Sequence, residues 1–421
     1  MTHSAGSEQA ADYSVIKECR GCGSTKLSEI LAFGLMPLAD GLLDSPEHAA
    51  KEVQYPLTVV FCEDCTLVQI LENVRPDILY CQDYPYFSSV SPVWLQHCRD
   101  NALELIETRQ LNSDSLVLEV ACNDGYLLKN FAEAGIPTLG IDPAEGPVAE
   151  ARKAGIEVHQ TFFTEEFAQE LADSGVSCDV MLGNNVLAHV PDQRAFARGV
   201  ATLLKKDGVA VIEFPYVRDL IDKCAFDTIY HEHHCYFSVT SVRHLFATAG
   251  LHVNDVRRLS THGGSLRIFV EHEDRPTEAM KALLAEEQEL GVDCLDFYHT
   301  FADRVRATEK ELNRLVTELR EQGKTVAAYG AAAKGTTLLN ASRVGSNLLD
   351  FVVDQNHHKH GRLMPGVHLP IYPTAHLAES RPDYTVMLAW NLKDEIMSQQ
   401  TAYTQAGGKF IIPVPQPQVV E

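Results

Sequence analysis

The chain has 421 residues, of which 45% are apolar and 22% charged, and it carries a formal net charge of −23. This length predicts two or three domains, and the charge argues against nucleic acid and anionic lipid as partners because both would be repelled. Residues 1–14 contain no signal peptide, and no run of about 18 apolar residues could span a membrane, so we expect a cytoplasmic protein.

Two CxxC pairs near the N-terminus contribute the four cysteines Cys19, Cys22, Cys62 and Cys65. Each pair can turn two thiolates toward one Zn²⁺ ion, and a strand predicted over residues 56–62 ends on the second pair. Four cysteine ligands leave no open coordination position, so the pattern predicts a structural zinc ion. A redox-active pair is the alternative, although the βαβ setting typical of thioredoxin-like pairs is missing.

Residues 115–143 have the pattern of a nucleotide-cofactor site. An apolar strand over 116–120 is followed by a turn at 123–125, a helix over 126–134 and a strand over 138–141 that ends on Asp142. An acidic residue about 20 positions past the first turn can bind a ribose diol. Because the turn has one glycine rather than GxGxxG, it favours a nucleoside without phosphates, such as S-adenosylmethionine, over NAD. An α/β domain without a cofactor is the alternative.

Two further strands, predicted over residues 179–182 and 209–214, continue an open parallel sheet. Asn184 and His189 follow the first of them. Because such sheets bind ligands at the carboxyl ends of their strands, both side chains are candidates for the site.

Segment 227–238, with the sequence DTIYHEHHCYFS, brings together three imidazoles, a carboxylate and a phenol, from Tyr230, His231, Glu232, His233 and His234. These groups cover acid–base chemistry near neutral pH, so the segment predicts a proton-transfer site. A histidine-rich loop without a function and part of a metal site are the alternatives.

Residues 278–322 are predicted to be largely helical, with an apolar stripe at Phe297, Phe301, Val305, Leu312, Leu315, Val316 and Leu319. A strand–turn–helix pattern over 326–340 and a strand over 349–353 then predict a second α/β domain. Lys334, near the start of that helix, suits a phosphate or a nucleotide. NAD binding lacks its glycine fingerprint here, and close helix–sheet packing would also explain the small residues of the turn.

Nine motifs follow one another along the chain: CRGCGS with the later CEDC, PLADGLL, DYPYFSS, VACNDGYLL, GNNVLAHVPD, DTIYHEHHCYFS, THGGSLR, YGAAAKGTTLLN and HGRLMPGVHLPI. Through them the chain resembles the three-domain, S-adenosylmethionine-dependent C-methyltransferases that act on nucleotide-linked deoxysugars. The best-known members methylate C-3 of a dTDP-4-keto-deoxysugar. The chain departs from the family pattern at Asp40, Ala121, His234 and Cys235, and the last two, beside the acid–base cluster, leave the sugar open.

The resemblance implies an α/β fold in three parts. A small zinc-binding domain would cover residues 1–78, a Rossmann-like class I methyltransferase domain that binds S-adenosylmethionine residues 79–275, and a helical linker with a Rossmann-like α/β domain residues 276–421. The last is expected to hold the substrate, a dTDP-linked sugar by analogy with the best-known members. S-adenosylmethionine and a structural Zn²⁺ ion are the expected cofactors, and a monomer is compatible with the sequence.

The resemblance also assigns residues to sites. The cofactor site would contain Glu119, Asn123, Gly125, Asp142, Pro143 and Asn184. The substrate site would contain His262, Lys334, Asn340 and Arg362. The catalytic residues would be His233, Tyr230, Glu232, His189 and Tyr84.

A carbon beside a ketone becomes nucleophilic only after losing a proton, so the reaction needs a base and donors toward the enolate oxygen. The resemblance places the base at His233, while Glu232 could orient an imidazole and Tyr230 and His189 could donate to the enolate. Tyr84 lies in a segment that the family brings to the same cleft. The sequence leaves His233, Tyr230 and His189 open as the base. The alternative functions are an O- or N-methyltransferase, a non-enzymatic nucleotide-sugar or zinc-dependent assembly protein, and a nicotinamide-dependent sugar oxidoreductase.

Overall fold

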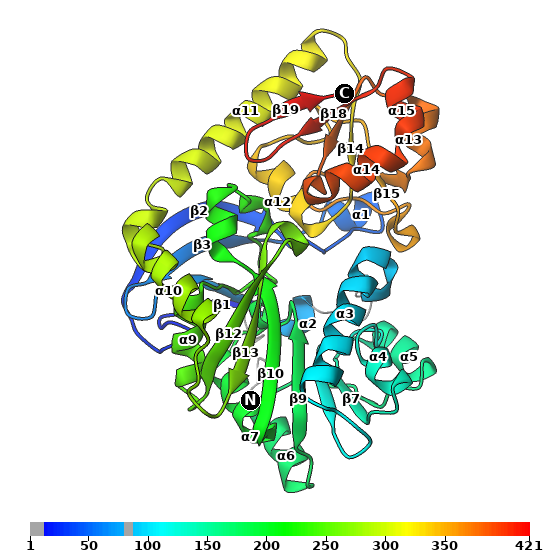
Figure 1. Cartoon of the computed structure of the whole chain (residues 1–421). Helices are drawn as coiled ribbons and strands as arrows, with labels where there is room; N and C mark the ends of the chain where they lie inside the picture. The colour runs from blue at the N-terminus through cyan, green and yellow to red at the C-terminus, as the bar shows by residue number, and fades with distance from the viewer. Residues whose placement is uncertain (1–11, 80–86) are drawn as a thin grey trace, which may run out of the picture.

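The computed structural model describes residues 12–79 and 87–421, which form three units (Figure 1). We call them the N-terminal unit (12–79), the central unit (87–271) and the C-terminal unit (278–421). Residues 301–421 of the C-terminal unit lie at the top of Figure 1, and the central unit lies at the bottom with residues 278–290 packed beside it. The strands of the N-terminal unit run between the two. Within the described ranges, no helix is long and apolar enough to cross a membrane.

The N-terminal unit is built from antiparallel strands. Its elements are β1 (Tyr13–Val15), β2 (Leu27–Pro37), α1 (Pro46–Ala49), β3 (Gln54–Cys62), β4 (Val68–Ile70), β5 (Glu72–Val74) and α2 (Pro76–Leu79). The main sheet has the order β11-β4-β3-β2, and its edge strand β11 (Cys235–Tyr236) comes from the acid–base segment of the central unit. The N-terminal unit is therefore completed by residues far along the chain.

The central unit is a seven-stranded sheet with helices on both faces. Its strands are β6 (Val117–Val120), β7 (Thr138–Ile141), β8 (Val158–His159), β9 (Cys178–Asn184), β10 (Leu204–Pro215), β12 (His252–Leu259) and β13 (Ser265–Glu271). The order is β12-β13-β10-β9-β6-β7-β8, with β13 antiparallel to both of its neighbours. All four residues of β6 are buried because the sheet is covered on both faces.

Helices and short 3₁₀ turns connect these strands. They are η1 (Ser88–Val90), α3 (Pro92–Thr108), α4 (Leu128–Glu133), α5 (Glu145–Lys153), α6 (Glu165–Asp173), η2 (Leu187–His189), α7 (Gln193–Leu203), α8 (Val217–Asp222), η3 (Phe226–Thr228), α9 (Val239–Ala247) and η4 (Thr261–Gly263). The chain changes direction across the sheet between β6 and β9, so the carboxyl ends of these two strands form the switch point where such folds bind ligands.

The C-terminal unit is a second α/β sheet, preceded by two helices. Its elements are α10 (Glu278–Leu290), η5 (Leu295–Tyr298), α11 (Phe301–Glu321), β14 (Val326–Tyr329), α12 (Ala333–Ala341), β15 (Val352–Asp354), η6 (His357–Lys359), β16 (Ile371–Pro373), α13 (Ala375–Ser380), β17 (Tyr384–Met387), η7 (Trp390–Leu392), α14 (Lys393–Gln399), α15 (Thr401–Gln405), β18 (Lys409–Ile412) and β19 (Gln418–Val420). The order β16-β15-β14-β17-β18-β19 places its switch point between β14 and β17. The predicted fold class, an α/β protein with a small N-terminal domain and two Rossmann-like sheets, is confirmed.

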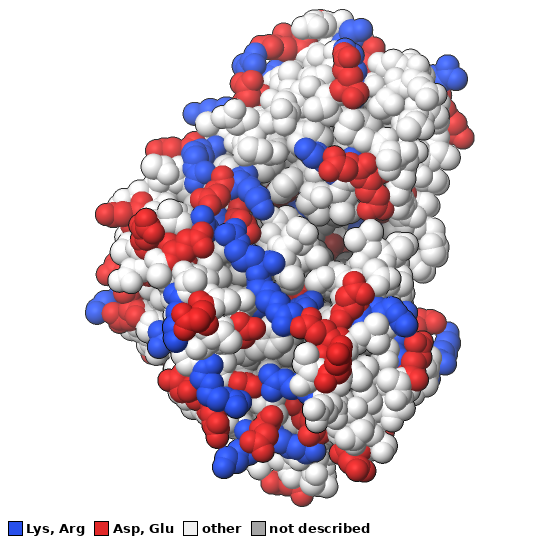
Figure 2. All heavy atoms as spheres, in the orientation of Figure 1, with Lys and Arg blue, Asp and Glu red and all other residues white. Residues whose placement is uncertain are grey.

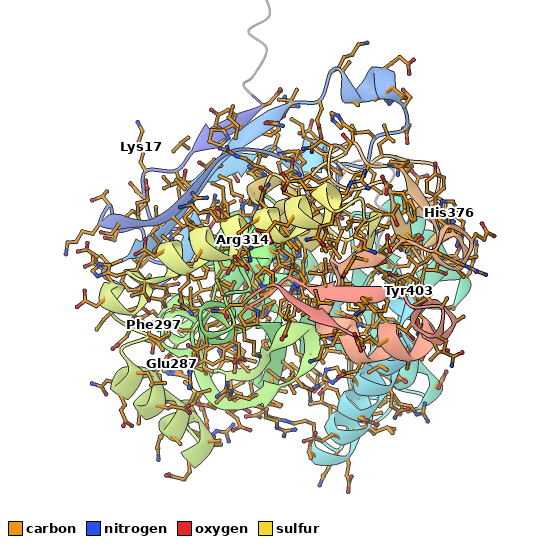
Figure 3. All side chains as sticks on the ribbon, turned by 90° about the horizontal axis from the view of Figure 1, so that it is seen from above. Lys17, Glu287, Phe297, Arg314, His376 and Tyr403 are labelled. Carbon is orange, nitrogen blue, oxygen red and sulfur yellow. The ribbon has the colours of Figure 1, made fainter. Side chains whose placement is uncertain are left out.

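The region predicted to be largely helical is two helices with a break. Helix α10 ends at Gly291, whose φ of 72° closes the helix in the left-handed conformation that glycine adopts most readily. The predicted apolar stripe lies in η5 and α11 and packs into one large core cluster. That cluster also contains Leu57 of β3, Phe226 of η3 and Val326 of β14, so a single core joins the three units. Figure 3 shows α11 running between the N-terminal strands and the C-terminal sheet.

Acidic and basic side chains are interspersed on the face seen in Figure 2, and the surface is hollowed where the C-terminal unit meets the central unit. The strong negative net charge is therefore not gathered into one acidic field on this face. The hollow lies on the side of the molecule where the carboxyl ends of the central strands approach the C-terminal unit.

Candidate active site

The acid–base segment is held between the two outer units. On one side β11 pairs with β4, and the Ile70 N–H donates to the carbonyl of His234 at 3.0 Å. On the other side Thr337 of α12 donates its hydroxyl to the carbonyl of Ile229, also at 3.0 Å. Both contacts are buried, so the backbone around the candidate base is fixed from the N-terminal and the C-terminal unit.

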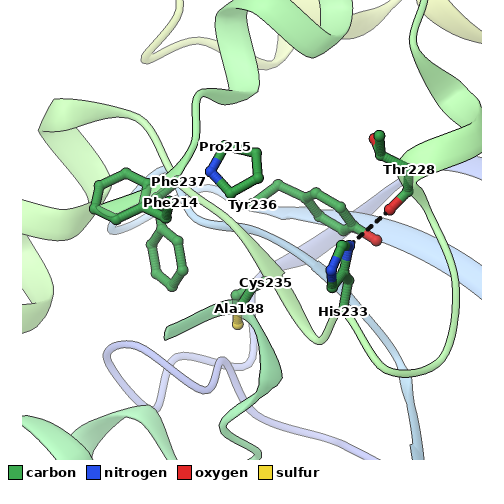
Figure 4. A pocket seen from close by; sticks show the side chains of 8 residues that line it. All are labelled: Ala188, Phe214, Pro215, Thr228, His233, Cys235, Tyr236 and Phe237. Carbon is green, nitrogen blue, oxygen red and sulfur yellow. Dashed lines mark hydrogen bonds between the residues drawn. The ribbon is translucent and has the colours of Figure 1, made fainter. Parts of the chain in front are cut away.

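The side chain of His233 is oriented by two hydrogen bonds, of which Figure 4 shows the one to Thr228. Its Nδ1 lies 2.8 Å from the carbonyl oxygen of Thr228, and because a carbonyl only accepts, Nδ1 carries the proton. The Nε2 of the neutral ring is then an acceptor, and it lies 3.0 Å from the hydroxyl of Tyr230, which donates to it. An imidazole with one nitrogen tied to a carbonyl and the other left basic has the arrangement that a general base requires.

Figure 4 shows His233 at the wall of a small, largely apolar cavity. The cavity is lined by Ala188, Phe214, Pro215, Thr228, His233, Cys235, Tyr236 and Phe237. Apolar surroundings strengthen the hydrogen bonds of the ring, since water competes less for them. Unlike the other histidines of the segment, His233 is only partly buried, so it is the one that can meet a substrate.

His189 lies beside His233, with 4.7 Å between the ring centroids in an edge-to-face arrangement. It is placed there by η2, the turn that follows β9. Burial lowers the pKa of His189 to about 4, so its ring is neutral at physiological pH. A neutral imidazole can donate an N–H to an enolate oxygen, whereas a pKa this low makes a weak base.

The remaining two histidines of the segment hold the structure together. His231 is buried, and its Nε2 lies 2.9 Å from the carbonyl of Pro56 in β3. His234 is also buried, and its backbone N–H donates to the carbonyl of Ala188 at 2.7 Å. Burial lowers the pKa of both imidazoles, which keeps them uncharged. Of the three imidazoles in the motif, the structure brings only that of His233 to the cavity.

Glu232 lies next to a second carboxylate, that of Asp40 in the PLADGLL motif. The backbone N–H of Asp40 donates to Glu232 Oε1 at 3.3 Å. Burial and the neighbouring charge of Asp40 raise the pKa of Glu232 to about 8, and burial also raises the pKa of Asp40. Glu232 is therefore a protonated carboxylic acid near neutral pH, able to donate a hydrogen bond.

This raised pKa predicts how stability depends on pH. Between about pH 4.5 and 8 the folded protein keeps a proton on Glu232 that the unfolded chain releases, so the free energy of unfolding should fall as pH rises through that window. Glu232→Gln should flatten this fall, which denaturant titrations at several pH values would measure. The matched control Glu289→Gln, on an exposed position of α10, should leave the profile unchanged. Equal profiles for wild type and Glu232→Gln would contradict the assignment.

Two residues of the candidate site are not among the predicted residues that the structure describes. Tyr84, within the DYPYFSS motif, lies outside the described residues. Thr228 was missed by the sequence analysis although its carbonyl orients His233. No sequence signal could have found it, because every residue has a backbone carbonyl and only the fold decides which one meets an imidazole.

The predicted cofactor loop follows β6 with an unusual backbone. Ala121, Asn123 and Gly125 have φ values of 57°, 49° and 76°, all in the left-handed region. For a residue other than glycine this conformation costs about 1–2 kcal/mol. The loop therefore adopts the left-handed backbone of a glycine-rich turn at alternate positions, although only one of these three residues is a glycine.

Asp142 stabilises that loop from the end of β7. Its Oδ2 accepts the backbone N–H of Asn123 at 2.9 Å, and its Oδ1 accepts that of Ala144 at 2.8 Å. Burial raises the pKa of Asp142 despite these two bonds. Each carboxylate oxygen retains a second lone pair, so a ribose diol can still be accepted. Pro143 lies between Asp142 and Ala144 and is partly buried.

The other predicted cofactor residues differ in their surroundings. Asn184, 7% exposed at the end of β9, has no hydrogen-bond partner for either amide atom among the described residues. Asn123 uses its side-chain oxygen to accept the N–H of Ser88 at 2.9 Å. Glu119 is 0% exposed, and burial raises its pKa well above the usual range. The buried, unsatisfied amide of Asn184 at the switch point and the carboxyl group of Asp142 at the end of β7 fit S-adenosylmethionine.

Lys334 is placed in the first turn of α12, at the switch point of the C-terminal sheet. Its Nζ is buried, has no hydrogen-bond partner among the described residues and lies 5.5 Å from the ring centroid of Trp390. Burial lowers the pKa of Lys334, while the charge of Asp227 opposes that shift. An unsatisfied cationic group at an uncapped helix N-terminus suits an anionic ligand.

The other three predicted substrate residues are not brought to Lys334 by contacts that the structure records. Asn340 donates to the carbonyls of Thr336 at 2.8 Å and Pro365 at 3.1 Å, which fixes a turn at the far end of α12. Arg362 forms an ion pair with Asp44 at 2.7 Å, tying the C-terminal unit to the N-terminal unit. The backbone of His262 lies in η4, and its side chain is outside the described residues.

The four predicted zinc ligands form one cluster. Their sulfur atoms all lie within 4.8 Å of one another, and the pairs Cys19–Cys65 and Cys22–Cys62 are separated by 3.5 Å and 3.6 Å. Tetrahedral zinc with Zn–S bonds of about 2.3 Å needs sulfur separations close to these. Hydrogen bonds with Cys62 and Cys65 lower the pKa of Cys19, while hydrogen bonds with Cys19 and Cys62 raise the pKa of Cys65, because the clustered thiols share protons that a metal would displace.

The zinc knuckle contacts the active site through Arg20. The guanidinium donates to the carbonyl of Pro191, in the loop that carries His189, at 3.0 Å. Gln69 donates to Cys19 Sγ at 3.1 Å and accepts the N–H of Arg20 at 2.9 Å, so the same side chain supports the sulfur and the contact. The zinc site therefore supports the loops of the active site without offering an open coordination position.

We expect purified protein to contain one zinc ion per chain, measurable by elemental analysis. Cys62→Ser should remove it and lower the temperature of unfolding, because the binding energy of a closed site is folding energy. Cys294→Ser, which changes an exposed cysteine elsewhere, should change neither quantity. Full zinc content in Cys62→Ser, or a stable protein without zinc, would contradict the structural role.

Comparison with known proteins gives matches to three families. Residues 19–80 match a zinc binding domain, residues 95–256 a methyltransferase domain, and residues 260–415 a domain described as the C-methyltransferase C-terminal domain. The C-methyltransferase NovU of Streptomyces niveus is 36% identical to the chain over 410 residues, which are 96% of this chain and 97% of that protein.

More distant similarities cover the central part of the chain. A ubiquinone biosynthesis O-methyltransferase of Acinetobacter baylyi is 28% identical over 219 residues, which are 44% of this chain and 86% of that protein. Among solved structures, the magnesium protoporphyrin IX methyltransferase from Synechocystis PCC 6803 with bound SAH has a TM-score of 0.35 at 19% identity, covering 44% of this chain and 89% of that one.

Proposed function

The chain belongs to the S-adenosylmethionine-dependent C-methyltransferases, and from this premise we propose that it methylates C-3 of a nucleotide-linked 4-keto-deoxysugar. One observation carries the proposal: the imidazole of His233 is held with Nδ1–H on a carbonyl and a basic Nε2 beside the Tyr230 hydroxyl. A methyl transfer to carbon needs such a base, because the acceptor carbon must lose a proton before it can attack.

In the proposed reaction His233 removes the proton from the carbon beside the ketone. The C–H electron pair becomes the double bond of an enolate, and the proton moves to Nε2. Since Tyr230 donates to Nε2, the phenol must turn its O–H away as the proton arrives, and the enolate oxygen is the acceptor it can turn to. Neutral His189 is a further donor beside the same ring, whereas the carboxyl of Glu232 lies beside Asp40.

S-adenosylmethionine, when bound, supplies a methyl group on a sulfonium, which the enolate carbon attacks as sulfur recovers the electron pair. The residues proposed to hold it are Asp142 for the ribose diol and Asn184 for a polar end of the cofactor. The loop would be shaped by Asn123, Gly125 and Pro143. Glu119 would support it from strand β6. The left-handed backbone at Ala121, Asn123 and Gly125 would let the loop approach the ligand closely.

We assign the nucleotide of the substrate to the C-terminal unit, which corresponds to the domain proposed over residues 276–421. Lys334 would hold the diphosphate, since its buried Nζ lacks a partner among the described residues and α12 begins there without a side-chain cap. A local cation of this kind is needed because the net charge of −23 does not attract an anion. We also propose that the first domain ends at residue 78 and the second at residue 275.

The test is a set of incubations with S-adenosylmethionine carrying a ¹³C-methyl group. A panel of dTDP- and GDP-linked 4-keto sugars is offered, and proton–carbon NMR of the product shows whether the methyl group sits on carbon, oxygen or nitrogen. We expect a C-methyl signal at C-3 with a dTDP-linked sugar. A methoxy or N-methyl signal, or no transfer to any 4-keto sugar of the panel, would overturn the proposal.

A further inference from the structure

Trp390 of the C-terminal unit makes one directed contact with the central unit. Its indole Nε1 donates to Asp227 Oδ2 at 2.6 Å. Asp227 is 0% exposed, and the tryptophan follows β17 at the switch point of the C-terminal sheet. A buried carboxylate is costly unless it is compensated, so this donor is a determinant of where Asp227 sits.

Asp227 immediately precedes Thr228, the residue whose carbonyl holds His233. A continuous path therefore runs from the Trp390 indole through the Asp227 carboxylate and the Thr228 carbonyl to His233 Nδ1. A shift of Asp227 moves the peptide that carries this carbonyl. Without the carbonyl, Nδ1 and Nε2 of a neutral imidazole become nearly equivalent sites for the proton.

Lys334 adds a charge to the same cluster. It lies over the ring of Trp390, and its charge opposes the rise that burial causes in the pKa of Asp227. The group proposed to meet the nucleotide phosphates is thus in the cluster that orients the base. Thr337, in the same first turns of α12, fixes the carbonyl of Ile229 on the other side of Thr228.

We propose that Trp390 and Asp227 are positioning residues through which the C-terminal unit sets the tautomer and direction of the His233 imidazole. This inference rests on the proposed role of His233 as the base. It assigns to the C-terminal unit a part in the chemical step, in addition to binding the nucleotide. The competing possibility is that the indole–carboxylate bond only joins two domains.

The first test reads the tautomer directly and needs no substrate. Protein labelled with ¹⁵N-histidine is compared by NMR as wild type, Trp390→Phe and Asp227→Asn, with His233→Gln identifying the His233 signals by their loss. The control is Tyr403→Phe, which removes a buried hydroxyl bonded to Thr385 and to the Lys409 carbonyl within the C-terminal unit (Tyr403 is labelled in Figure 3).

We expect Nδ1–H alone in wild type and Tyr403→Phe, and a mixture of tautomers in the two positioning variants. If Trp390→Phe fails to fold, Asp227→Asn, which has the shape of the native side chain, gives the same comparison. Unchanged His233 signals in a folded Trp390→Phe or Asp227→Asn variant would overturn the proposal.

The second test separates positioning from substrate binding. Trp390→Phe and Asp227→Asn should each lower kcat about 10- to 100-fold, with KM for the sugar and affinity for S-adenosylmethionine changed less than about threefold. The double variant should lose no more than the worse single variant, because both act on one path. A loss confined to KM, or multiplying losses in the double variant, would refute it. If wild type methylates no 4-keto sugar, the proposed function fails while the NMR comparison still decides the positioning role.

Discussion

His233→Ala should lower methyl transfer by about 10²–10⁴-fold while S-adenosylmethionine and the sugar nucleotide still bind. The variant removes the only ring of the acid–base segment that is both partly accessible and held with a basic nitrogen beside a phenol. His189 cannot replace it well, since burial keeps its pKa near 4. Single-turnover kinetics with labelled cofactor, together with calorimetric affinities for both ligands, would measure the effect.

Tyr230→Phe distinguishes two ways in which the proton can leave. If the phenol only donates to Nε2 and then to the enolate oxygen, its loss should be milder than that of His233. If the phenol itself takes the proton and passes its own to His233, both variants should be equally severe. The ring contact of Tyr230 with His233, at 4.1 Å between centroids, is kept in Tyr230→Phe, so the comparison isolates the hydroxyl.

Exchange of the substrate proton with deuterated solvent tests the base without methyl transfer. S-adenosylhomocysteine replaces the cofactor, and the proton beside the ketone is followed by NMR. Wild type should exchange, and His233→Ala should not. Exchange that persists in His233→Ala but is lost in Tyr230→Phe or His189→Ala would move the base to that residue and refute the assignment.

Structural features that depend on a short stretch of neighbouring residues were predictable from the sequence. The strand Thr138–Ile141 has its expected limits, and the four cysteines meet in one cluster, because strand length and CxxC spacing depend on neighbouring residues only. Strand 179–182 proved two residues longer at its end, including Gly183 and Asn184. Asn184 therefore lies within β9 rather than after it, although still at the carboxyl edge where a ligand is expected.

Contacts between distant parts of the chain could not be predicted. His231 bonds to Pro56, 175 residues away, and Arg362 to Asp44, 318 residues away, and nothing in either residue type indicates the partner. The pairing of Trp390 with Asp227 is of the same kind. Histidines and arginines near a site look alike in sequence whether they meet a substrate or tie two units together.

The cofactor loop shows that a backbone conformation typical of glycine can form where the sequence has other residues. Ala121 and Asn123 occupy positions where the backbone is left-handed, so the missing glycines suggested a different loop from the one that forms. The strain is offset in part by the bonds from Asn123 N–H and Ala144 N–H to the Asp142 carboxylate. Asp142 consequently has two tasks, and its replacement affects both.

Asp142→Ala should weaken S-adenosylmethionine binding by at least about tenfold, since hydrogen bonds to charged groups contribute about 1.5–3 kcal/mol each. Loss of the loop support adds to the loss of the ribose contacts. Calorimetry measures the affinity. Asp354→Ala is the matched control, because Asp354 supports the corresponding turn of the C-terminal sheet by accepting from Ala331 N–H at 2.7 Å and Asn356 N–H at 2.7 Å. That variant should leave cofactor affinity unchanged.

A cofactor analogue without the ribose hydroxyls separates the two tasks of Asp142. If the carboxylate accepts the diol, wild type should bind the analogue at least about tenfold more weakly than S-adenosylmethionine, by the same hydrogen-bond energies. Asp142→Ala should bind both equally, because the group that senses the hydroxyls is gone. A variant that still discriminates as strongly as wild type would mean that Asp142 only supports the loop. The ribose would then have to be bound by another residue at the carboxyl edge of the sheet.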